Sequence, residues 1–308
     1  MKISVIIPTK NRADSLRVTL DHLLRQLKKN DEVIIIDNKS TDHTKIVVDT
    51  FRKKKLLPTI IYKVENLSGP SYARNLGIKS SSNDILAFLD DDCIVSSKWV
   101  TNIKNFYLLK KKHSKIILQG KITHISKEND IFYQILILKN KYSLEVLKKK
   151  QIDNYVNYIN AGNFSCTRLV VNKYSKFFDE KNFPFICEER ELSQRLNLDG
   201  FLIKFFKKMP VIHQKQQKTL LNSLVTGYKY GLYTGKIIKK FKSKNKVQVL
   251  FKSEIKERFQ RNIFKEIMYI TFRIKTNYFK KVIIFIYLII REIIYQVALF
   301  FGKNSRLR

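Results

Sequence analysis

The sequence predicts an α/β fold in which helices cover a mostly parallel, Rossmann-like sheet. Four short apolar runs, at 3–8, 32–37, 59–65 and 85–90, have the composition of buried strands. Segments with helical spacing or helix-capping residues lie between them. Strands that alternate with helices in this way form parallel sheets, because each helix carries the chain back to start the next strand.

The three helices between these strands are predicted from different signals. The segment at 40–51, STDHTKIVVDTF, opens with capping residues and continues with a helical pattern. SYARNLGIKS, at 71–80, has the character of a short helix. The helix expected at 12–28 carries leucines at helical spacing, namely Leu16, Leu20, Leu23, Leu24 and Leu27.

The middle of the chain is less regular, and its predicted elements are mixed. Helices are expected at 97–112, 131–150 and 188–200, the last ending at Gly200, and strands at 115–125, 163–168 and 202–206.

The composition changes after His213. Residues 214–308 hold 22 Lys and Arg against 4 Asp and Glu, a net charge of +18, whereas the longer first part carries +16. Aromatic and Ile/Leu faces are set among these lysines, as in amphipathic helices. We therefore predict a domain at 1–213 and a basic helical C-terminal region at 214–308.

The whole chain of 308 residues has a formal net charge of +34. Such a charge attracts polyanions, including nucleic acid, anionic lipid and phosphate-bearing substrates. The alternative is compositional, because Lys, Ile and Asn are abundant everywhere and the lysines are then simply solvated surface. A nucleic-acid-binding protein is thus one hypothesis, although the sequence contains no recognised nucleic-acid motif.

Three cysteines without a close pair argue against a disulfide frame or a zinc site and are typical of a reducing cytoplasm. The apolar run at the N-terminus is too short for the core of a signal peptide. The longest apolar stretch, 282–301, is interrupted by Arg291 and Glu292, so we expect it to lie in a membrane interface rather than to span a membrane.

Polar residues follow three of the predicted strands, at 8–11, at 37–38 and at 90–92. Ligands bind such sheets at the carboxyl ends of the strands, so these residues should converge. The three consecutive aspartates, Asp90, Asp91 and Asp92, would repel one another unless a cation lies between them. Oxygen ligands of this kind are typical of Mg²⁺ or Mn²⁺ sites. A solvated acidic loop is the alternative.

Eight motifs in order make residues 1–213 resemble family 2 glycosyltransferases of the GT-A fold. They are SVIIPTKNRADSL, VIIIDNKSTDHT, NLSGPSYARNLGI, ILAFLDDDCIVSSKWV, AGNFSCTR, FFDE, CEERELSQRL and VIH. The resemblance implies that a nucleotide diphosphate-sugar donates its sugar to an acceptor hydroxyl, with inversion at the anomeric carbon. It also implies a divalent cation, Mn²⁺ or Mg²⁺, that bridges the diphosphate.

The resemblance assigns roles to individual residues. Asp92 would be the main metal ligand, Asp91 a ribose or metal contact, and Asp90 a residue that shapes the turn beside the donor. His213 would approach the metal or the pyrophosphate, unless it is structural. Nucleotide recognition would fall to Pro8, Thr9, Asn11, Arg12, Asp37, Asn38 and Arg74.

Three of these positions, Asp37, Asn38 and Arg74, leave alternatives open. The family usually has two aspartates after the second strand, where this chain has Asp37 and Asn38, so a uridine nucleotide is expected but not secured. Asp37 could instead cap the helix that follows. Arg74 could pair with a phosphate or only with an exposed carboxylate.

The same resemblance points to the general base that the acceptor hydroxyl requires. Glu189 aligns with the usual aspartate base, while Glu188 interacts with the helix dipole and Glu191 completes the acidic motif. Cys187 replaces a glycine, which should exclude a backbone conformation with positive φ at low cost. Asn163 is expected either to face the acceptor or to close a turn.

Other nucleotide-dependent α/β enzymes remain an alternative, although PTKNR replaces the glycine-rich turn that they need after the first strand. For residues 214–308, membrane-surface binding is favoured over a helical lid or a dimer interface. The protein is then cytoplasmic and peripheral on the inner face of the cell membrane, with a glycan or lipid-linked sugar as acceptor in cell-surface polysaccharide synthesis. The donor sugar and the oligomeric state are not predicted.

Overall fold

The structure is a computed structural model. It describes residues 1–54, 58–108, 115–125, 155–214, 219–241 and 263–305, together with isolated positions between 131 and 142. The chain divides into two compact units, each described separately below. Unit 1 comprises residues 1–125 and 153–215, and unit 2 comprises 126–152 and 216–308.

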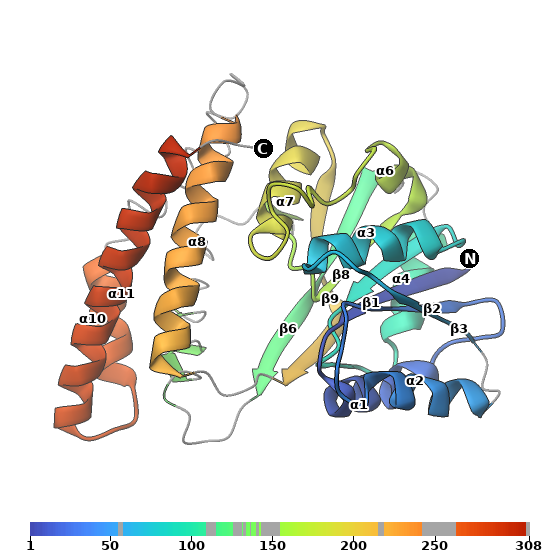
Figure 1. The fold of residues 1–308 in the computed structure, drawn as a ribbon, viewed down its shortest axis with the longest axis horizontal. Coiled ribbons are helices and arrows are strands. Elements are labelled where there is room, and N and C mark those ends of the chain that lie inside the picture. Colours follow the sequence, from blue (N-terminus) through green and yellow to red (C-terminus); the bar gives the residue numbers. More distant parts are fainter. Residues whose placement is uncertain are drawn as a thin grey trace. The chain divides into compact units, whose positions relative to one another are not determined.

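Unit 1 is built on one mixed sheet (Figure 1). Its strands lie in the spatial order β3-β2-β1-β4-β8-β6-β9-β5, and β7 pairs with β9. Their bounds are β1 Ile3–Thr9, β2 Glu32–Asp37, β3 Thr59–Val64, β4 Ile85–Leu89, β5 Cys93–Val95, β6 Ile116–Ile125, β7 Tyr155–Val156, β8 Asn163–Thr167 and β9 Leu202–Gln214.

The first four strands are mutually parallel, as the sequence predicts, because a helix separates each from the next. Beyond β4 the sheet becomes mixed. β8 runs antiparallel to β4 and β6, and β9 runs parallel to β6 but antiparallel to β5. The chain places β2 on one side of β1 and β4 on the other, so the strand order turns back between β1 and β4. Open α/β sheets bind ligands beside the carboxyl ends of the strands at such a switch point.

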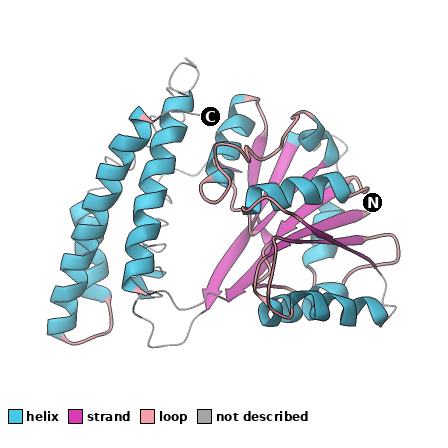
Figure 2. Cartoon of the chain, viewed as in Figure 1, coloured by secondary structure: helices cyan, strands magenta, loops and turns pink. Residues whose placement is uncertain are grey.

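Helices cover both faces of this sheet (Figure 2). One core lies under α1, α2 and α4, where Leu16, Leu20 and Trp99 are fully buried. The other lies under α3, α6 and α7, where Phe88 stacks on Phe164 with ring centroids 4.3 Å apart. The bounds are α1 Ala13–Leu24, α2 Thr44–Lys53, α3 Pro70–Ser80, α4 Trp99–Leu108, α6 Arg168–Asn172 and α7 Glu188–Leu198.

The predicted elements that lie in the described part of unit 1 are confirmed, with two differences. β5, β7 and α6, which have two to five residues each, were not predicted from the sequence. β9 continues to Gln214, eight residues past its predicted end, because its second half pairs with β5 and β6. Most of the helix predicted at 131–150 lies outside the described residues.

Unit 2 contains α8 Leu220–Phe241, α10 Ile263–Arg273 and α11 Tyr278–Asn304. α8 and α11 run parallel and in close contact, because glycines remove the side chains between them. A Cβ added at Gly231 would lie 2.3 Å from the carbonyl oxygen of Tyr295, and one added at Gly235 would lie 2.4 Å from that of Leu299. The two backbones therefore meet directly, as in helix pairs with small residues at the interface.

The opposite side of α11 is apolar and exposed. Ile286, Ile290 and Ile293 expose 51%, 44% and 58% of their surface, while Lys280 and Lys303 stand near the two ends of the helix. With a mean hydropathy of 2.1 in its most apolar window, α11 is the one described helix long and apolar enough to cross a membrane, by length and composition alone.

Candidate active site

The carboxyl ends of β1, β2 and β4 meet at one edge of the sheet, as predicted. Thr9 and Asp37 are register partners at the ends of β1 and β2. The Thr9 hydroxyl donates a hydrogen bond of 2.8 Å to Asp91, which follows β4. The polar residues after these strands are thus brought together by the parallel register itself.

The three consecutive aspartates have different partners. Asp90 accepts from Arg74 at 3.0 Å. Asp91 is fixed at its side chain by Thr9 and Arg12 and at its backbone carbonyl by the Thr19 hydroxyl, at 2.9 Å. The turn therefore directs Asp90 toward Arg74, whereas Asp91 and Asp92 share Arg12 as a donor.

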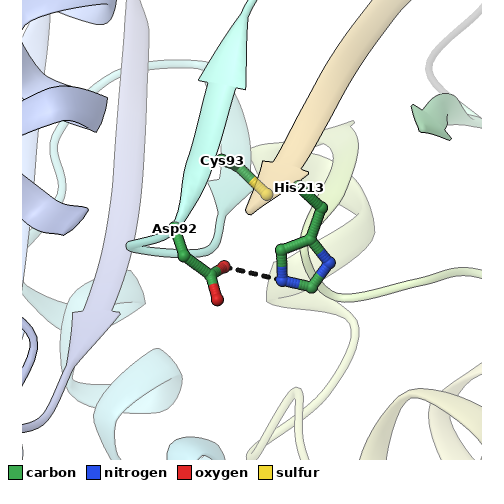
Figure 3. Close-up of side chains that lie close together, drawn as sticks. All are labelled: Asp92, Cys93 and His213. Carbon is green, nitrogen blue, oxygen red and sulfur yellow. Dashed lines mark ion pairs between the residues drawn. The ribbon is translucent and has the colours of Figure 1, made fainter. Parts of the chain in front are cut away.

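Asp92 lies between Arg12 and His213. Nη1 of Arg12 binds one carboxylate oxygen, and Nε2 of His213 lies 2.7 Å from the other (Figure 3). The pairing of β5 with β9 places Cys93 opposite His213, so that Asp92, Cys93 and His213 present ligand atoms within 4.8 Å of one another. Carboxylate oxygens suit Mg²⁺ and Mn²⁺, and imidazole nitrogen is a ligand for other divalent transition metals, so the residues present fit a divalent cation.

Burial governs the charge state of this cluster. It raises the pKa of Asp91 to about 7, although Arg12 acts in the opposite direction. Burial would also raise the pKa of Asp92, but His213 and Arg12 outweigh it and lower that pKa. The two carboxylates therefore depend on nearby cationic or hydrogen-bonding groups to stay ionised.

The loops after β1 and β2 are cross-linked. Asn11 adopts a left-handed conformation with φ of 52°, and its side-chain oxygen accepts from the backbone N–H of Thr41 at 2.7 Å. Asp37 accepts from the Ser40 backbone N–H at 2.7 Å and from the Tyr62 hydroxyl at 2.5 Å. Asp37 thus closes the turn that follows β2, but it does not cap α2, which begins at Thr44 with His43 as its N-cap residue. Pro8 is half-buried in β1.

The contacts of Asn38 account for an asparagine at the position where the family usually has an aspartate. Its amide donates to the carbonyls of Glu65 and Leu67, at 3.1 and 2.7 Å, and accepts from the Gly69 N–H at 2.8 Å. An aspartate could not donate to those carbonyls. Asn38 therefore holds the loop between β3 and α3, and the described contacts favour this structural role over contact with a nucleotide base.

Arg74 joins the aspartate turn to the start of α7. It is almost fully buried and donates to Asp90 and, at 2.8 Å, to Glu188. Of the alternatives left open by the sequence, the structure thus shows pairing with carboxylates, and these are more buried than expected. Glu188 accordingly does more than interact with the helix dipole, since it fixes α7 to the aspartate turn.

The acidic residues of α7 lie in different environments. The buried Glu191 binds Arg195 through both oxygens, at 2.8 to 3.0 Å, which is a structural pairing. Glu189 is half-buried, and a hydrogen bond from its own backbone N–H acts to lower the pKa of its carboxyl. Burial and the adjacent Glu188 outweigh it and raise the pKa of Glu189 to about 8. Glu188 and Glu191 are bound to arginines, which makes Glu189 the candidate of the three to accept a proton.

The expectation for Cys187 is wrong. Cys187 caps α7 in a left-handed conformation, with φ of 63°, and is fully buried. A non-glycine residue pays about 1–2 kcal/mol for this conformation. The surrounding packing thus enforces the backbone geometry that a glycine adopts freely.

Asn163 closes a structural junction. It is fully buried, accepts from the Trp99 indole at 3.0 Å, and donates to the carbonyls of Lys121 and Met209. This packing favours the structural alternative over contact with an acceptor.

Sequence reasoning missed two residues near Asp92. Cys93 belongs to the cluster because β5 pairs with β9, and the ring of His124 lies 5.1 Å from that of His213 because β6 pairs with β9. Both depend on long-range strand pairing. The one local signal was the position of Cys93 directly after the aspartates.

Comparisons with known proteins agree with this geometry. The sequence model described as "Glycosyl transferase family 2" matches residues 4–176. Poly(ribitol-phosphate) beta-glucosyltransferase of Bacillus spizizenii is 32% identical over 41% of this chain and 20% of its own length. Poly(ribitol-phosphate) beta-N-acetylglucosaminyltransferase TarP of Staphylococcus aureus is 29% identical over 54% of each chain. This chain thus spans about a fifth of the first relative and about half of the second.

Solved structures share the fold. S. aureus TarS 1-349 in complex with UDP-GlcNAc superposes with a TM-score of 0.53 and 15% identity, covering 100% of this chain and 93% of that one. The mannosyltransferase PcManGT from Pyrobaculum calidifontis, in complex with GDP-Man and Mn²⁺, gives 0.64 and 13%, covering 98% and 86%. The fold is therefore GT-A-like. Since the family match covers more than half of the chain, this protein belongs to glycosyltransferase family 2.

Proposed function

We propose that this protein is an inverting, metal-dependent glycosyltransferase that uses a UDP-sugar to extend a cell-surface polysaccharide. One observation carries the proposal. Asp92, which follows the buried Asp91, lies beside His213, and the same aspartate turn is joined through Arg74 to the helix that bears Glu189. A site for the diphosphate and a base for the acceptor thus belong to one connected framework.

In the proposed reaction, Glu189 accepts the proton of the acceptor hydroxyl. The oxygen then attacks the anomeric carbon, and the bond from that carbon to the diphosphate breaks, with inversion in a single displacement. Arg74 and Glu188 position the helix that presents Glu189. Because Arg74 is occupied by two carboxylates, positioning is the role we assign to it.

Asp92, Asp91 and His213 would hold the divalent cation, with Mn²⁺ as the ion found in the PcManGT complex. When bound, such an ion neutralises charge on the departing nucleoside diphosphate. Thr9 and Arg12 lie beside these residues, and we assign them to the surface that binds the nucleotide. Asn11 and Asp37 hold the loops that border this surface.

The choice of UDP and of a polymer acceptor comes from relatives. TarS has been solved with UDP and with UDP-GlcNAc, and TarP is named for transfer of N-acetylglucosamine to poly(ribitol-phosphate). We propose a glycan or lipid-linked sugar as acceptor for this chain. We also assign catalysis to residues 1–213 and a separate role in location to residues 214–308.

A thermal-shift panel tests the donor proposal. UDP, GDP, CDP and ADP are compared with and without Mn²⁺, because a ligand raises the unfolding temperature in proportion to its binding free energy. We expect UDP with Mn²⁺ to give the largest shift. Asp92→Asn should abolish the Mn²⁺-dependent part and lower donor hydrolysis at least 100-fold, whereas Asp14→Asn, an exposed carboxylate on α1, should change neither. Full activity in Asp92→Asn would reject the assignment.

We further propose that residues 214–308 hold the enzyme on the inner face of the cell membrane. The exposed apolar side of α11 and the basic composition of this region support it, because apolar faces and lysines both favour an anionic lipid surface. As part of this proposal, α11 lies in the membrane interface and does not span the membrane.

Flotation of the full chain with anionic vesicles tests membrane binding. The triple variant Ile286→Gln, Ile290→Gln, Ile293→Gln should float at least tenfold less than the wild type. A matched variant that changes exposed apolar residues of unit 1, Ile46→Gln, Leu108→Gln, Leu169→Gln, should float normally. Equal flotation of all three proteins rejects the role of α11. Tight binding of RNA or DNA at physiological salt would favour the nucleic-acid alternative instead.

A further inference from the structure

Arg12 occupies the carboxylates that the proposed function gives to a metal ion. Its Nη1 lies 3.2 Å from Asp91 Oδ1 and also binds Asp92. Asp92 is thereby engaged at both oxygens, by Arg12 on one side and His213 on the other. A cation that takes Asp92 through the Arg12-bound oxygen must displace this guanidinium.

The charges explain why Arg12 lies there. The side chains of Asp91 and Asp92 are only 7% and 6% exposed, and two adjacent buried carboxylates are costly without a cation. Burial by itself would lower the pKa of Arg12, but the two aspartates outweigh it and raise that pKa. Arg12 therefore acts as the counter-ion of the pair in the structure described here.

Arg12 is held far less firmly than the other arginine of the site. Both Nη atoms of Arg74 bind carboxylates, and its side chain is 5% exposed. Arg12 uses a single nitrogen, exposes 35% of its side chain and precedes α1 in a non-helical conformation. Its Nε and Nη2 donate to no residue that the structure describes, so two donor nitrogens remain for the oxygens of a phosphate.

We propose that Arg12 is an exchangeable counter-ion: it closes the Asp91–Asp92 pair to a free divalent cation and moves to the diphosphate when cation and nucleotide arrive together. This inference rests on the proposed function of the same site. It makes nucleotide and cation binding cooperative, since the nucleotide supplies the phosphate oxygens that replace the aspartates as partners of Arg12. Linkage then requires that each ligand raise the affinity for the other by the same factor.

The test measures Mn²⁺ binding by electron paramagnetic resonance of the free ion, with and without UDP, in the full chain. For the wild type we expect weak binding of Mn²⁺ alone and at least tenfold tighter binding with saturating UDP. In Arg12→Gln, Mn²⁺ alone should bind at least tenfold more tightly than in the wild type, and the factor gained from UDP should shrink.

Two variants serve as matched controls. Arg17→Gln removes the same charge from α1, the helix that follows Arg12, at an exposed position that pairs with Asp14 at 3.9 Å, and should behave as the wild type. Arg12→Lys keeps the charge and should keep Mn²⁺ binding weak without UDP. The proposal is overturned if Arg12→Gln binds Mn²⁺ alone no more tightly than Arg17→Gln, or if Arg12→Lys behaves like Arg12→Gln.

The same titrations separate this inference from the proposed function. Asp92→Asn should lose Mn²⁺ binding with or without UDP. If the wild type binds no Mn²⁺ even with UDP while Arg12→Gln binds it, the counter-ion role stands and the choice of UDP fails. If neither protein binds Mn²⁺, both proposals fail. If Arg12→Gln unfolds, Arg12→Lys is compared with Arg17→Gln instead. The quantity compared is the factor by which UDP tightens Mn²⁺ binding. Loss of that factor in Arg12→Lys alone would contradict a role based on charge.

Discussion

Nη1 of Arg74 donates a hydrogen bond of 2.8 Å to Oε1 of Glu188, and both side chains are buried. Glu188 directly precedes Glu189, and its charge acts on the neighbouring carboxyl. Burial and this neighbouring charge together raise the pKa of Glu189 to about 8. A general base near that value is half-protonated under mildly alkaline conditions, so the pair sets the pH at which the base is available.

The first prediction concerns the pH dependence of transfer. A base must be unprotonated to accept a proton, so the rate should rise with pH and level off above about 8. Glu188→Gln removes the negative neighbour, lowers the pKa of Glu189 and should move the rising limb to lower pH. Initial rates between pH 5.5 and 9 measure this, and an unchanged limb in Glu188→Gln would contradict the assigned cause.

The second prediction links the same pKa to stability. The pKa of Glu189 is raised on folding, so folding favours its protonated form, and stability is lost as pH rises from the ordinary value of glutamate through about 8. Glu189→Gln should remove this loss while lowering the transfer rate by about 10² to 10⁴-fold. Urea unfolding at pH 5 and pH 9, followed by fluorescence of the single tryptophan, buried Trp99, measures it. A pH dependence identical to that of the wild type would refute the assigned titration.

The third prediction concerns Arg74 itself. Arg74→Met leaves Asp90 and Glu188 without their cation, and breaking a buried pair in this way costs about 3–5 kcal/mol. Arg52→Met removes a surface pair, to Asp49 at 3.6 Å, and should cost about 1 kcal/mol or less. Unfolding of both variants is followed through Trp99. Equal losses in the two would show that the buried arrangement contributes no special stability.

The fourth prediction distinguishes two glycines of α8. Gly231→Ala places a methyl group 2.3 Å from the carbonyl oxygen of Tyr295, so the helices must separate. The nearest atom at Gly227 is 3.3 Å away, on the flexible side chain of Arg291, and Gly227→Ala should be tolerated. Hydrogen exchange of α8 and α11 should speed up in Gly231→Ala and stay near the wild type in Gly227→Ala. Equal exchange in both variants would mean that α8 and α11 do not pack as described.

Local patterns were enough to predict the parallel part of the sheet and its polar edge. β1, β2 and β4 are largely apolar runs, and a helix follows each of the first three strands, so the aspartates after β4 were expected to lie beside Thr9. The second half of β9 was not predictable in this way. Its lysines and Pro210 do not resemble a strand, and they form one because β5 and β6 lie on either side.

The roles of single residues depended on contacts that the motif order does not contain. Asn38 looked like a weakened nucleotide contact, but its amide meets two carbonyls that an aspartate could not satisfy. Cys187 looked incompatible with a left-handed cap, yet burial holds it there. The substituted residue was visible in both cases, whereas the three-dimensional surroundings that make it acceptable were not.

The end of β9 has a mechanical consequence. Ile125 and Gln214 are register partners, one step beyond the pair formed by His124 and His213. The chain leaves unit 1 for unit 2 directly after Ile125 and again after Lys215. Both departures of the chain from unit 1 therefore follow the same end of the β6–β9 ladder, so a load applied to the chain at either point would act first on the two strands that hold the histidines.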